Sequence, residues 1–453
     1  MQQLQKKLER RLGLFSVTNI VIANIIGAGI FTTTGYLMGF LQNPVMMLVL
    51  WGIGGMVAFC GAVSFGELGA AFPEAGGEYV FISKLYSPLL GFLSGWLSLI
   101  VGFSAPIAAS AIGFSKYFVW AFPKLQNWLL LSEILSTENF SRCLAILVII
   151  SFSVIHSRDI ILGARIQNGL TLLKILLVVG LIIVGLSFGN GDMQNLRPAQ
   201  AFQFNFANWK AAGLSLMFIM FAYSGWNSAT YIGSEIKEPK QVIPRSLLIS
   251  TLVVTVLYLL LNLFFVYAVP GDQMRNEPEI GGLAVGLAFG PTAETVISLL
   301  ISFALFSSLS AFIILGPRVY YKMARDGLFF DSIAKINAKR KVPSNAIILQ
   351  AAIAIVLVLS GTFEQILTYM GFSLGIFPII AVAGNIKLRR MKTSVLHLSG
   401  FPFVQVFFIV VSVAMLVLAY FERPVESSIA VLTALSGIPV FYWFKRKKAK
   451  RSE

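Results

Sequence analysis

The sequence has 453 residues, of which 57% are hydrophobic and only 12% are charged. Its mean hydropathy of +0.81 leaves too little polar surface to cover a water-soluble globule of this length. A formal net charge of +15 would suggest nucleic-acid binding in a soluble protein, but a chain this apolar must have the lipid bilayer as its solvent. The basic residues are therefore expected to set membrane topology, and no nucleic-acid partner is expected.

Apolar runs of about 20 residues recur along the chain between polar, proline and glycine punctuation. In the first half they predict helices over residues 14–40, 44–72, 78–120, 142–157, 160–188 and 208–236. In the second half they predict helices over residues 244–269, 291–325, 344–360, 364–386, 401–420 and 424–444. The third and eighth runs are long enough to tilt or to project from the bilayer. Residues 1–453 are thus predicted to form a single all-α, polytopic membrane domain of about twelve transmembrane helices.

Lysine and arginine residues gather in alternate loops, which is the pattern that sets membrane orientation. Placing both chain ends in the cytoplasm puts most of them on that side, including Lys6, Lys7, Arg10, Arg11, Arg158, Lys335, Lys339, Arg340, Lys341, Lys387, Arg389, Arg390, Lys392, Lys445, Arg446, Lys447 and Lys448. The opposite loops carry only scattered basic residues such as Lys124 and Arg197. We expect a multi-pass protein with cytoplasmic N and C termini, and therefore an even number of crossings. No cleavable leader is expected.

Little in the sequence favours catalysis. The two cysteines, Cys60 and Cys143, lie in or at the edge of apolar runs and give no disulfide or metal-binding spacing. The two histidines, His156 and His397, lie near predicted helix ends. We therefore predict that the chain is not an enzyme and has no catalytic residue, metal or cofactor.

Glycine and other small residues interrupt the first and the sixth run. The first reads Asn24-Ile-Ile-Gly-Ala-Gly-Ile-Phe31, and the sixth reads Phe221-Ala-Tyr-Ser-Gly-Trp226. Each glycine inside a helix costs about 1 kcal/mol relative to alanine, so both segments are candidates for unwinding, although either one alone is also explained by close helix packing. Because the two runs lie five helices apart, they start on opposite sides of the membrane. Paired breaks in oppositely oriented halves are typical of inverted-repeat transporters.

An unwound helix exposes amide groups from one half and carbonyl groups from the other, which suits a zwitterionic ligand. The amides expected to hold a carboxylate are those of Ala28, Gly29 and Ile30. The carbonyls expected to accept from an ammonium group are those of Ile25, Phe221, Ala222 and Ser224. Lys174 is the only basic residue well inside an apolar run, so it is expected either to face a cavity or a partner, or to extend toward water near Asn168.

Charged residues also mark the ends of two runs, at Glu235 through Pro239 and at Arg325-Asp-Gly327. Such clusters usually anchor helix ends and form loop salt bridges. A role in gating is the alternative.

Six motifs stand out along the chain: Ile26-Gly-Ala-Gly-Ile-Phe31, Gly66-Glu-Leu-Gly69, Gly76-Gly-Glu-Tyr79, Phe221 to Trp226, Glu235 to Pro239 with Pro244 and Arg245, and Arg318 to Gly327. In these motifs and their order, over roughly residues 14–400, the sequence resembles the L-type amino acid transporter family, within the amino acid, polyamine and organocation superfamily. The resemblance implies a LeuT-type fold of two inverted five-helix repeats, with broken first and sixth helices and two peripheral helices. These units would cover residues 14–188, 208–386 and 401–444.

The resemblance also implies sodium-independent amino acid transport, commonly by exchange. Lys174 matches a lysine that replaces a sodium ion of sodium-coupled relatives, and Ser308 matches its usual hydroxyl neighbour. Tyr258 aligns less clearly with a tyrosine near the first break, and Phe221 matches an aromatic residue that closes over the substrate. Animal members pair with a glycoprotein through a cysteine after the third helix. Residues 121–141 contain no cysteine, so no disulfide-linked heavy chain is expected, which fits a prokaryotic, inner-membrane member.

The leading interpretation is an exchanger of neutral, small L-amino acids. The alternatives are a proton-coupled symporter in which Lys174 changes protonation, and a sensor that binds amino acid without moving it. Ser224 occupies a position where relatives that accept cationic substrates can have an acidic residue, and the first, sixth and eighth runs offer no other carboxylate at membrane depth. Cationic amino acids are therefore expected to compete poorly.

Overall fold

The computed structural model describes residues 10–122, 124–125, 127–128, 136–158, 160–198, 202–336, 342–361, 363–392 and 395–452. Nearly all of this part of the chain is helical, and it contains no β-strand. Ten of the helical stretches found there are long and apolar enough to cross a membrane, and three further apolar helices are shorter. The all-α, polytopic class is confirmed. Lys6, Lys7, Lys339, Arg340 and Lys341, which contributed to the predicted topology, and part of the 121–141 loop lie outside the described residues.

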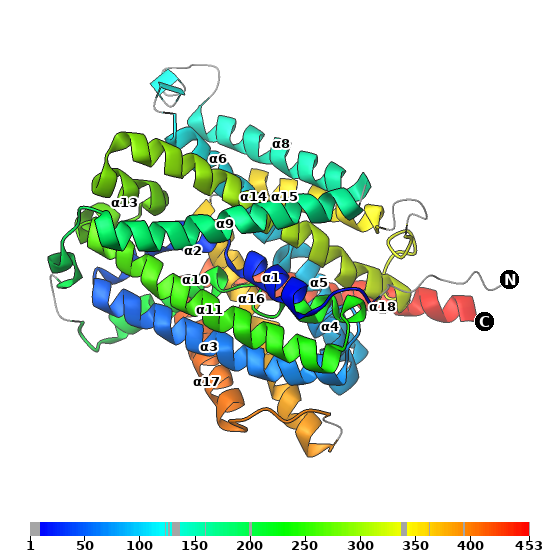
Figure 1. Cartoon of the computed structure of the whole chain (residues 1–453). Helices are drawn as coiled ribbons and strands as arrows, with labels where there is room; N and C mark the ends of the chain where they lie inside the picture. Colours follow the sequence, from blue (N-terminus) through cyan, green and yellow to red (C-terminus); the bar gives the residue numbers. More distant parts are fainter. Residues whose placement is uncertain are drawn as a thin grey trace.

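Long helices lie side by side in one bundle (Figure 1). Those that run without a break are α3 (Pro44–Ala71), α8 (Thr137–Arg158), α9 (Ile160–Phe188), α11 (Pro239–Ala268), α14 (Pro291–Arg325), α16 (Phe363–Arg390), α17 (Phe403–Glu422) and α18 (Pro424–Ser452). The ninth predicted span is the shorter helix α15 (Ser344–Ser360). Two helices were not predicted, α12 (Gly271–Met274) and α13 (Ile280–Phe289), which precede α14.

The first predicted span is broken in its middle, as expected. Helix α1 (Leu14–Ile25) ends and α2 (Ala28–Leu41) begins around Ile26 and Gly27, whose backbones are extended. Gly27 provides no side-chain cap for α2. The first amides of α2 therefore lack both an intrahelical and a capping partner, which leaves them available to a ligand.

The sixth predicted span is also broken, but its second half is not the helix that was expected to continue to residue 236. Helix α10 (Phe206–Ala222) ends before Gly225, whose φ of +98° favours glycine. Beyond it the chain forms two short 3₁₀ turns, η3 (Ser228–Tyr231) and η4 (Gly233–Glu235). The positive φ interrupts the helical hydrogen-bond ladder, and the chain does not return to an α-helix before Pro239.

The prediction of one helix over residues 78–120 is wrong. A short helix, α4 (Glu78–Leu85), is followed by a separate span made of α5 (Pro88–Leu97), the π-helical segment η1 (Ser98–Gly102) and α6 (Ser104–Trp120). The hydroxyl of Ser87 accepts from the Leu90 amide at 3.2 Å, and Pro88 occupies the first turn of α5. Because serine caps and first-turn prolines start helices, the chain turns here instead of continuing.

The first and last described segments of the chain lie at the same end of the bundle, which we call the terminal end. The Leu12 amide donates to the Glu235 carbonyl at 3.0 Å, and the Gly76 amide donates to the Tyr231 carbonyl at 3.2 Å. The Lys448 ammonium, near the end of α18, donates to the Asp326 carbonyl at 2.8 Å. Figure 1 shows α18 projecting beyond the bundle near α4. A shared end is what an even number of crossings requires. Its cytoplasmic location remains a prediction.

Helices from the two predicted repeats interleave instead of forming separate lobes. Helix α1 packs against α11 and α14, α2 packs against α10, and α3 packs against α11. The two breaks are thereby brought together. The division into repeats at residues 14–188 and 208–386, with peripheral helices over 401–444, remains a prediction.

Candidate functional site

The breaks of the two helices face each other across a small pocket, which we call the break pocket. A Cβ added to Gly29 would lie 2.5 Å from the Cα of Ala222, so only glycine permits this approach. The pocket is lined by Asn24, Ile25, Gly27, Ala28, Gly29, Pro106, Ser110, Phe221, Ala222, Ser224 and Phe312. All of the predicted substrate-binding residues except Ile30 line it. Ile30 is fully buried outside the lining.

Tyr258 links the two breaks. Its hydroxyl lies 2.8 Å from the Ile25 carbonyl oxygen and 3.0 Å from the Ala222 carbonyl oxygen. Both carbonyls were expected to accept from a substrate ammonium, and in the structure both already face this hydroxyl. Each carbonyl oxygen has a second lone pair, so it can still accept from a ligand. Tyr258 thus lies beside the first break, and its role in binding or coupling remains a prediction.

Lys174 lies where α9 crosses α1 and α14. Its ammonium donates to the Ala23 carbonyl at 3.0 Å, to the Ser308 hydroxyl at 2.7 Å, and to the Ile26 carbonyl. The Ser308 hydroxyl also donates to the Ile26 carbonyl, at 2.9 Å. The side chain of Lys174 is 0% exposed, so it does not extend to water near Asn168. The structure therefore joins Lys174 and Ser308 to the last residues before the first break.

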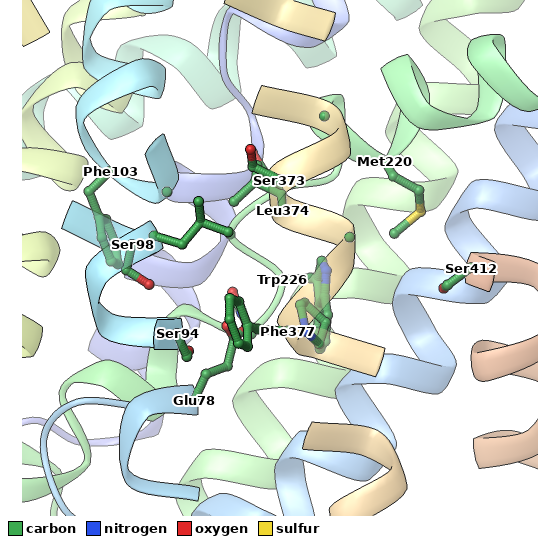
Figure 2. Close-up of a pocket in the computed structure, with 18 of the residues that line it drawn as sticks. Glu78, Ser94, Ser98, Phe103, Met220, Trp226, Ser373, Leu374, Phe377 and Ser412 are labelled. Carbon is green, nitrogen blue, oxygen red and sulfur yellow. The ribbon is translucent and has the colours of Figure 1, made fainter. Parts of the chain in front are cut away.

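A second pocket adjoins the break pocket and shares Asn24, Ser224 and Phe312 with it. We call it the Glu78 pocket. Glu78, Ser94 and Ser98 gather on one side, opposite Met220 and Ser412 (Figure 2). The segments that carry Glu78 and Tyr231 are joined at the terminal end by the Gly76 to Tyr231 hydrogen bond. The Glu78 pocket therefore lies between the break pocket and the terminal end.

The Glu78 carboxylate is buried, with an exposed fraction of 6%. It accepts from the Asn227 amide group at 2.8 Å and also interacts with the Tyr231 hydroxyl. Burial raises the pKa of Glu78 to about 7, against the lowering effect of the hydrogen bonds from Asn227 and Tyr231. No ion pair of Glu78 is found within the described ranges, so its charge has no basic partner there.

Sequence reasoning did not single out Glu78 as a site residue. It lies in the motif Gly76-Gly-Glu-Tyr79, which contributed only to the family resemblance. Because a continuous helix was predicted from residue 78, the turn at Ser87 was not predicted. That turn allows α4 to lie beside η3. A glutamate directly after two glycines, at the start of the predicted 78–120 run, was the available signal.

Charged side chains at the terminal end link neighbouring elements. Arg318 of α14 pairs with Glu235 of η4 at 3.3 Å. Asp326 accepts from the Tyr79 hydroxyl at 2.8 Å and pairs with Lys322 at 2.8 Å. These clusters do form salt bridges, as expected of charges at helix ends. The alternative gating role remains a prediction.

The chemistry available at the site is that of binding. In the part of the chain that the structure describes, no group of three or more His, Cys, Asp or Glu side chains is placed to hold a metal ion. Cys60 is buried and Cys143 is exposed on α8, and both are free. Backbone amides of α2, carbonyl oxygens and serine hydroxyls surround the break pocket, and these groups can hold a polar ligand.

Comparisons with known proteins identify the family that this sequence matches. A model of the family described as amino acid permease matches residues 12–443. The mouse b(0,+)-type amino acid transporter 1 is 27% identical over 447 residues, covering 96% of this chain and 88% of the relative. The human large neutral amino acids transporter small subunit 2 is 27% identical over 457 residues, covering 97% of this chain and 82% of the relative. The mouse Asc-type amino acid transporter 1 is 26% identical over 454 residues, covering 98% and 83%.

Proposed function

This chain belongs to the amino acid permease family, and from that membership we propose that it carries small, neutral L-amino acids across the inner membrane without sodium, by alternating-access exchange. Relatives named as amino acid transporters support the substrate class. The terminal end would face the cytoplasm, in line with the basic loops. Like its relatives, the protein would be a transporter and not an enzyme.

The observation that carries the proposal is the position of the Lys174 ammonium. It is held by oxygen atoms of Ala23, Ile26 and Ser308, a set of neutral ligands that also suits a bound cation. A protonated lysine held there would supply the positive charge that a sodium ion would bring. The carbonyls that it binds end α1 immediately before the break. Substrate binding at the break would therefore need no sodium.

The break pocket suits a small zwitterion. The substrate carboxylate would bind the first amides of α2, at Ala28 to Ile30, where the helix dipole favours an anion. The ammonium would face the carbonyls of Ile25, Ala222 and Ser224, and the ring of Phe221 would cover the ligand. Glycine and alanine at the break let a ligand approach the backbone, and the small volume of the pocket leaves little room for a large side chain. Its described lining residues include no Asp or Glu, which favours neutral substrates.

Counterflow in proteoliposomes tests this function. Purified protein is reconstituted into vesicles loaded with unlabelled alanine, and uptake of labelled alanine is compared with that into empty vesicles. Exchange predicts uptake that requires internal alanine and does not change when sodium is replaced by choline. Binding of alanine without flux would instead identify a sensor and overturn the proposal.

Proton-coupled symport is the second candidate. It is favoured by the fact that all the partners of the Lys174 ammonium are neutral oxygen atoms, so no carboxylate fixes its charge. Under symport, an imposed pH gradient drives net uptake into empty vesicles. Under exchange, the gradient alone drives none.

We also propose that the chain acts without a disulfide-linked heavy chain. Cys143, exposed on α8, is the available thiol outside the protein interior. Cys143→Ser is expected to leave counterflow unchanged, and non-reducing electrophoresis of protein from its native membrane is expected to show a single chain. A larger band that disappears on reduction would contradict this.

A further inference from the structure

Glu78 lines a pocket whose described lining residues include no lysine or arginine. A buried carboxylate without a cation is costly, and proteins normally pair such a group or place it where a ligand supplies the charge. The hydrogen bond from Asn227 and the contact with Tyr231 satisfy part of its capacity. An ionised carboxylate has about four acceptor positions, so further donors can bind it from the pocket side.

Other polar atoms around the same pocket also lack partners. The Asn24 side-chain oxygen and the Ser94 hydroxyl are buried and make no hydrogen bond within the described part of the chain. Asn24 is 2% exposed and Ser94 is 1% exposed. Both line the Glu78 pocket, and Figure 2 shows Ser94 beside Glu78. Together the carboxylate and these two oxygen atoms form a set of hydrogen-bond acceptors.

A primary ammonium group is the complement of this set, because it has three donors and one positive charge. We propose that the Glu78 pocket is a second binding subsite, which holds the ammonium group of an amino acid between the break pocket and the terminal end. This inference rests on the proposed function and extends it to a second step of the path. Asn24 and Ser224 line both pockets, so a substrate can keep contact with them while it moves from one to the other.

A purely structural role for Glu78 makes a different prediction. Its bond to Asn227 fastens α4 to the chain after the second break, and loss of that bond alone would lower thermal stability. It would not change how the protein responds to an amine. The test therefore has to measure ligand response separately from stability.

The first arm uses purified protein and does not depend on transport. Propylamine carries an ammonium group without a carboxylate, and propionate carries the reverse. Propylamine is expected to raise the melting temperature of the wild-type protein, and Glu78→Gln is expected to weaken its binding about tenfold, the effect of losing one charged hydrogen bond. Propionate is expected to bind both proteins equally. Glu78→Asp keeps the charge and is expected to bind propylamine more tightly than Glu78→Gln.

Glu74→Gln is the matched control. Glu74 lies four residues earlier, pairs with Lys322 at 3.4 Å and does not line the pocket. Propylamine binding is expected to be unchanged in this variant. Ser94→Ala provides a second test that keeps the carboxylate, and it is expected to weaken propylamine binding about threefold through loss of one neutral acceptor. Ser94→Ala also tests the subsite if Glu78→Gln does not fold.

The second arm measures counterflow of alanine from each face of oriented vesicles, with the terminal end identified by protease access to the C-terminal segment. Glu78→Gln is expected to raise the half-saturating alanine concentration at that face about tenfold, and at the other face by less than about twofold. Alanine methyl ester carries its ammonium group on Cα, and Nα-acetyl-lysine carries its ammonium group on the side chain. Comparing how strongly each competes with alanine shows which ammonium position the subsite binds.

Three results would overturn the subsite: no propylamine response in the wild type, equal responses in the wild type and Glu78→Gln, or equal binding by the Asp and Gln variants. An equal rise of half-saturation at both faces would also count against it. The proposed function can fail independently, because absence of counterflow does not affect the propylamine measurement.

Discussion

The Lys174 ammonium lies 2.7 Å from the Ser308 hydroxyl, and both groups bind the Ile26 carbonyl at the end of α1. Three helices therefore meet at one positive charge. Lys174→Ala would remove this donor from the Ala23 and Ile26 carbonyls and from the Ser308 hydroxyl. The Ile26 carbonyl and the Ser308 hydroxyl would keep their bond to each other, whereas the Ala23 carbonyl would lose the lysine bond, at a cost of about 1–3 kcal/mol if it is left unpaired. We expect counterflow to fall at least about tenfold while the protein remains folded and inserted.

Lys210→Ala is the control for that experiment. Lys210 pairs with Glu422 at 3.0 Å and is partly exposed, so its loss is expected to leave transport unchanged. Full activity of Lys174→Ala in sodium-free buffer would disprove the proposed role of the ammonium. Restoration of Lys174→Ala by added sodium would show that the emptied position can bind the ion.

Gly29 permits contact between the two breaks. An alanine Cβ there would lie 2.5 Å from the Ala222 Cα, closer than real Cβ atoms approach, and that backbone atom cannot move away as a flexible side chain would. We expect Gly29→Ala to separate α2 from α10 and to reduce counterflow strongly. Gly180→Ala on α9 meets no atom within 4 Å and is expected to leave transport intact while stabilising the protein by about 0.5–1 kcal/mol. Similar activities of the two variants would show that the breaks can separate without loss of function.

Ser224 is expected to favour neutral over cationic substrates. It lines both pockets, and the described lining of the break pocket contains no carboxylate, so an arginine side chain held within that pocket would lack a counter-ion there. Alanine or serine should therefore compete with labelled alanine far better than arginine or lysine does. Ser224→Asp is expected to narrow the difference in competition between neutral and cationic amino acids. Ser224→Asn introduces a side chain of the same size as Asp but without charge, and it is not expected to narrow the difference. Arginine that competes as well as alanine in the wild type would show that the pocket is assigned incorrectly.

Glu78 is expected to make amine binding depend on pH near neutrality. Its carboxyl pKa is raised by burial to about 7, so the group is neutral below that pH and ionised above it. Only the ionised form attracts an ammonium group, and propylamine itself stays protonated in this range. Propylamine binding is expected to strengthen about tenfold from pH 6 to pH 8, as the ionised fraction rises. Glu78→Gln is expected to show a flat profile, and an equal pH dependence in both proteins would assign the titration to another group.

Much of the fold follows from local patterns. Apolar runs located the long helices, and the small residues at Gly27 and Gly225 located both breaks, because glycine is where a helix ends at least cost. The division between α4 and α5 was missed. Ser87 and Pro88 are a helix-start signal, but the surrounding residues are apolar enough to read as one span. The short turns after Gly225 depend on packing against α4 and α14, which hydropathy does not report.

The site was harder to predict from the sequence than the fold. Lys174 was conspicuous because a lysine inside an apolar run is rare, yet its contacts with Ala23 and Ile26 join positions about 150 residues apart. Glu78 showed no such contrast, since it lies among polar and glycine residues. Its proximity to Asn227 results from the tertiary placement of α4 against η3, and a single sequence does not give that placement.

The Tyr258 hydroxyl faces two carbonyls but has a single hydrogen atom to donate. At any instant it can bond fully to Ile25 on one broken helix, fully to Ala222 on the other, or weakly to both. The hydrogen atom thus makes the two helices compete for one donor, and any relative displacement between them must favour one carbonyl. A ligand that donates to the carbonyl left without the hydrogen would shift that choice, so rotation of the hydroxyl about the C–O bond of Tyr258 would follow which of the two broken helices the ligand has bound.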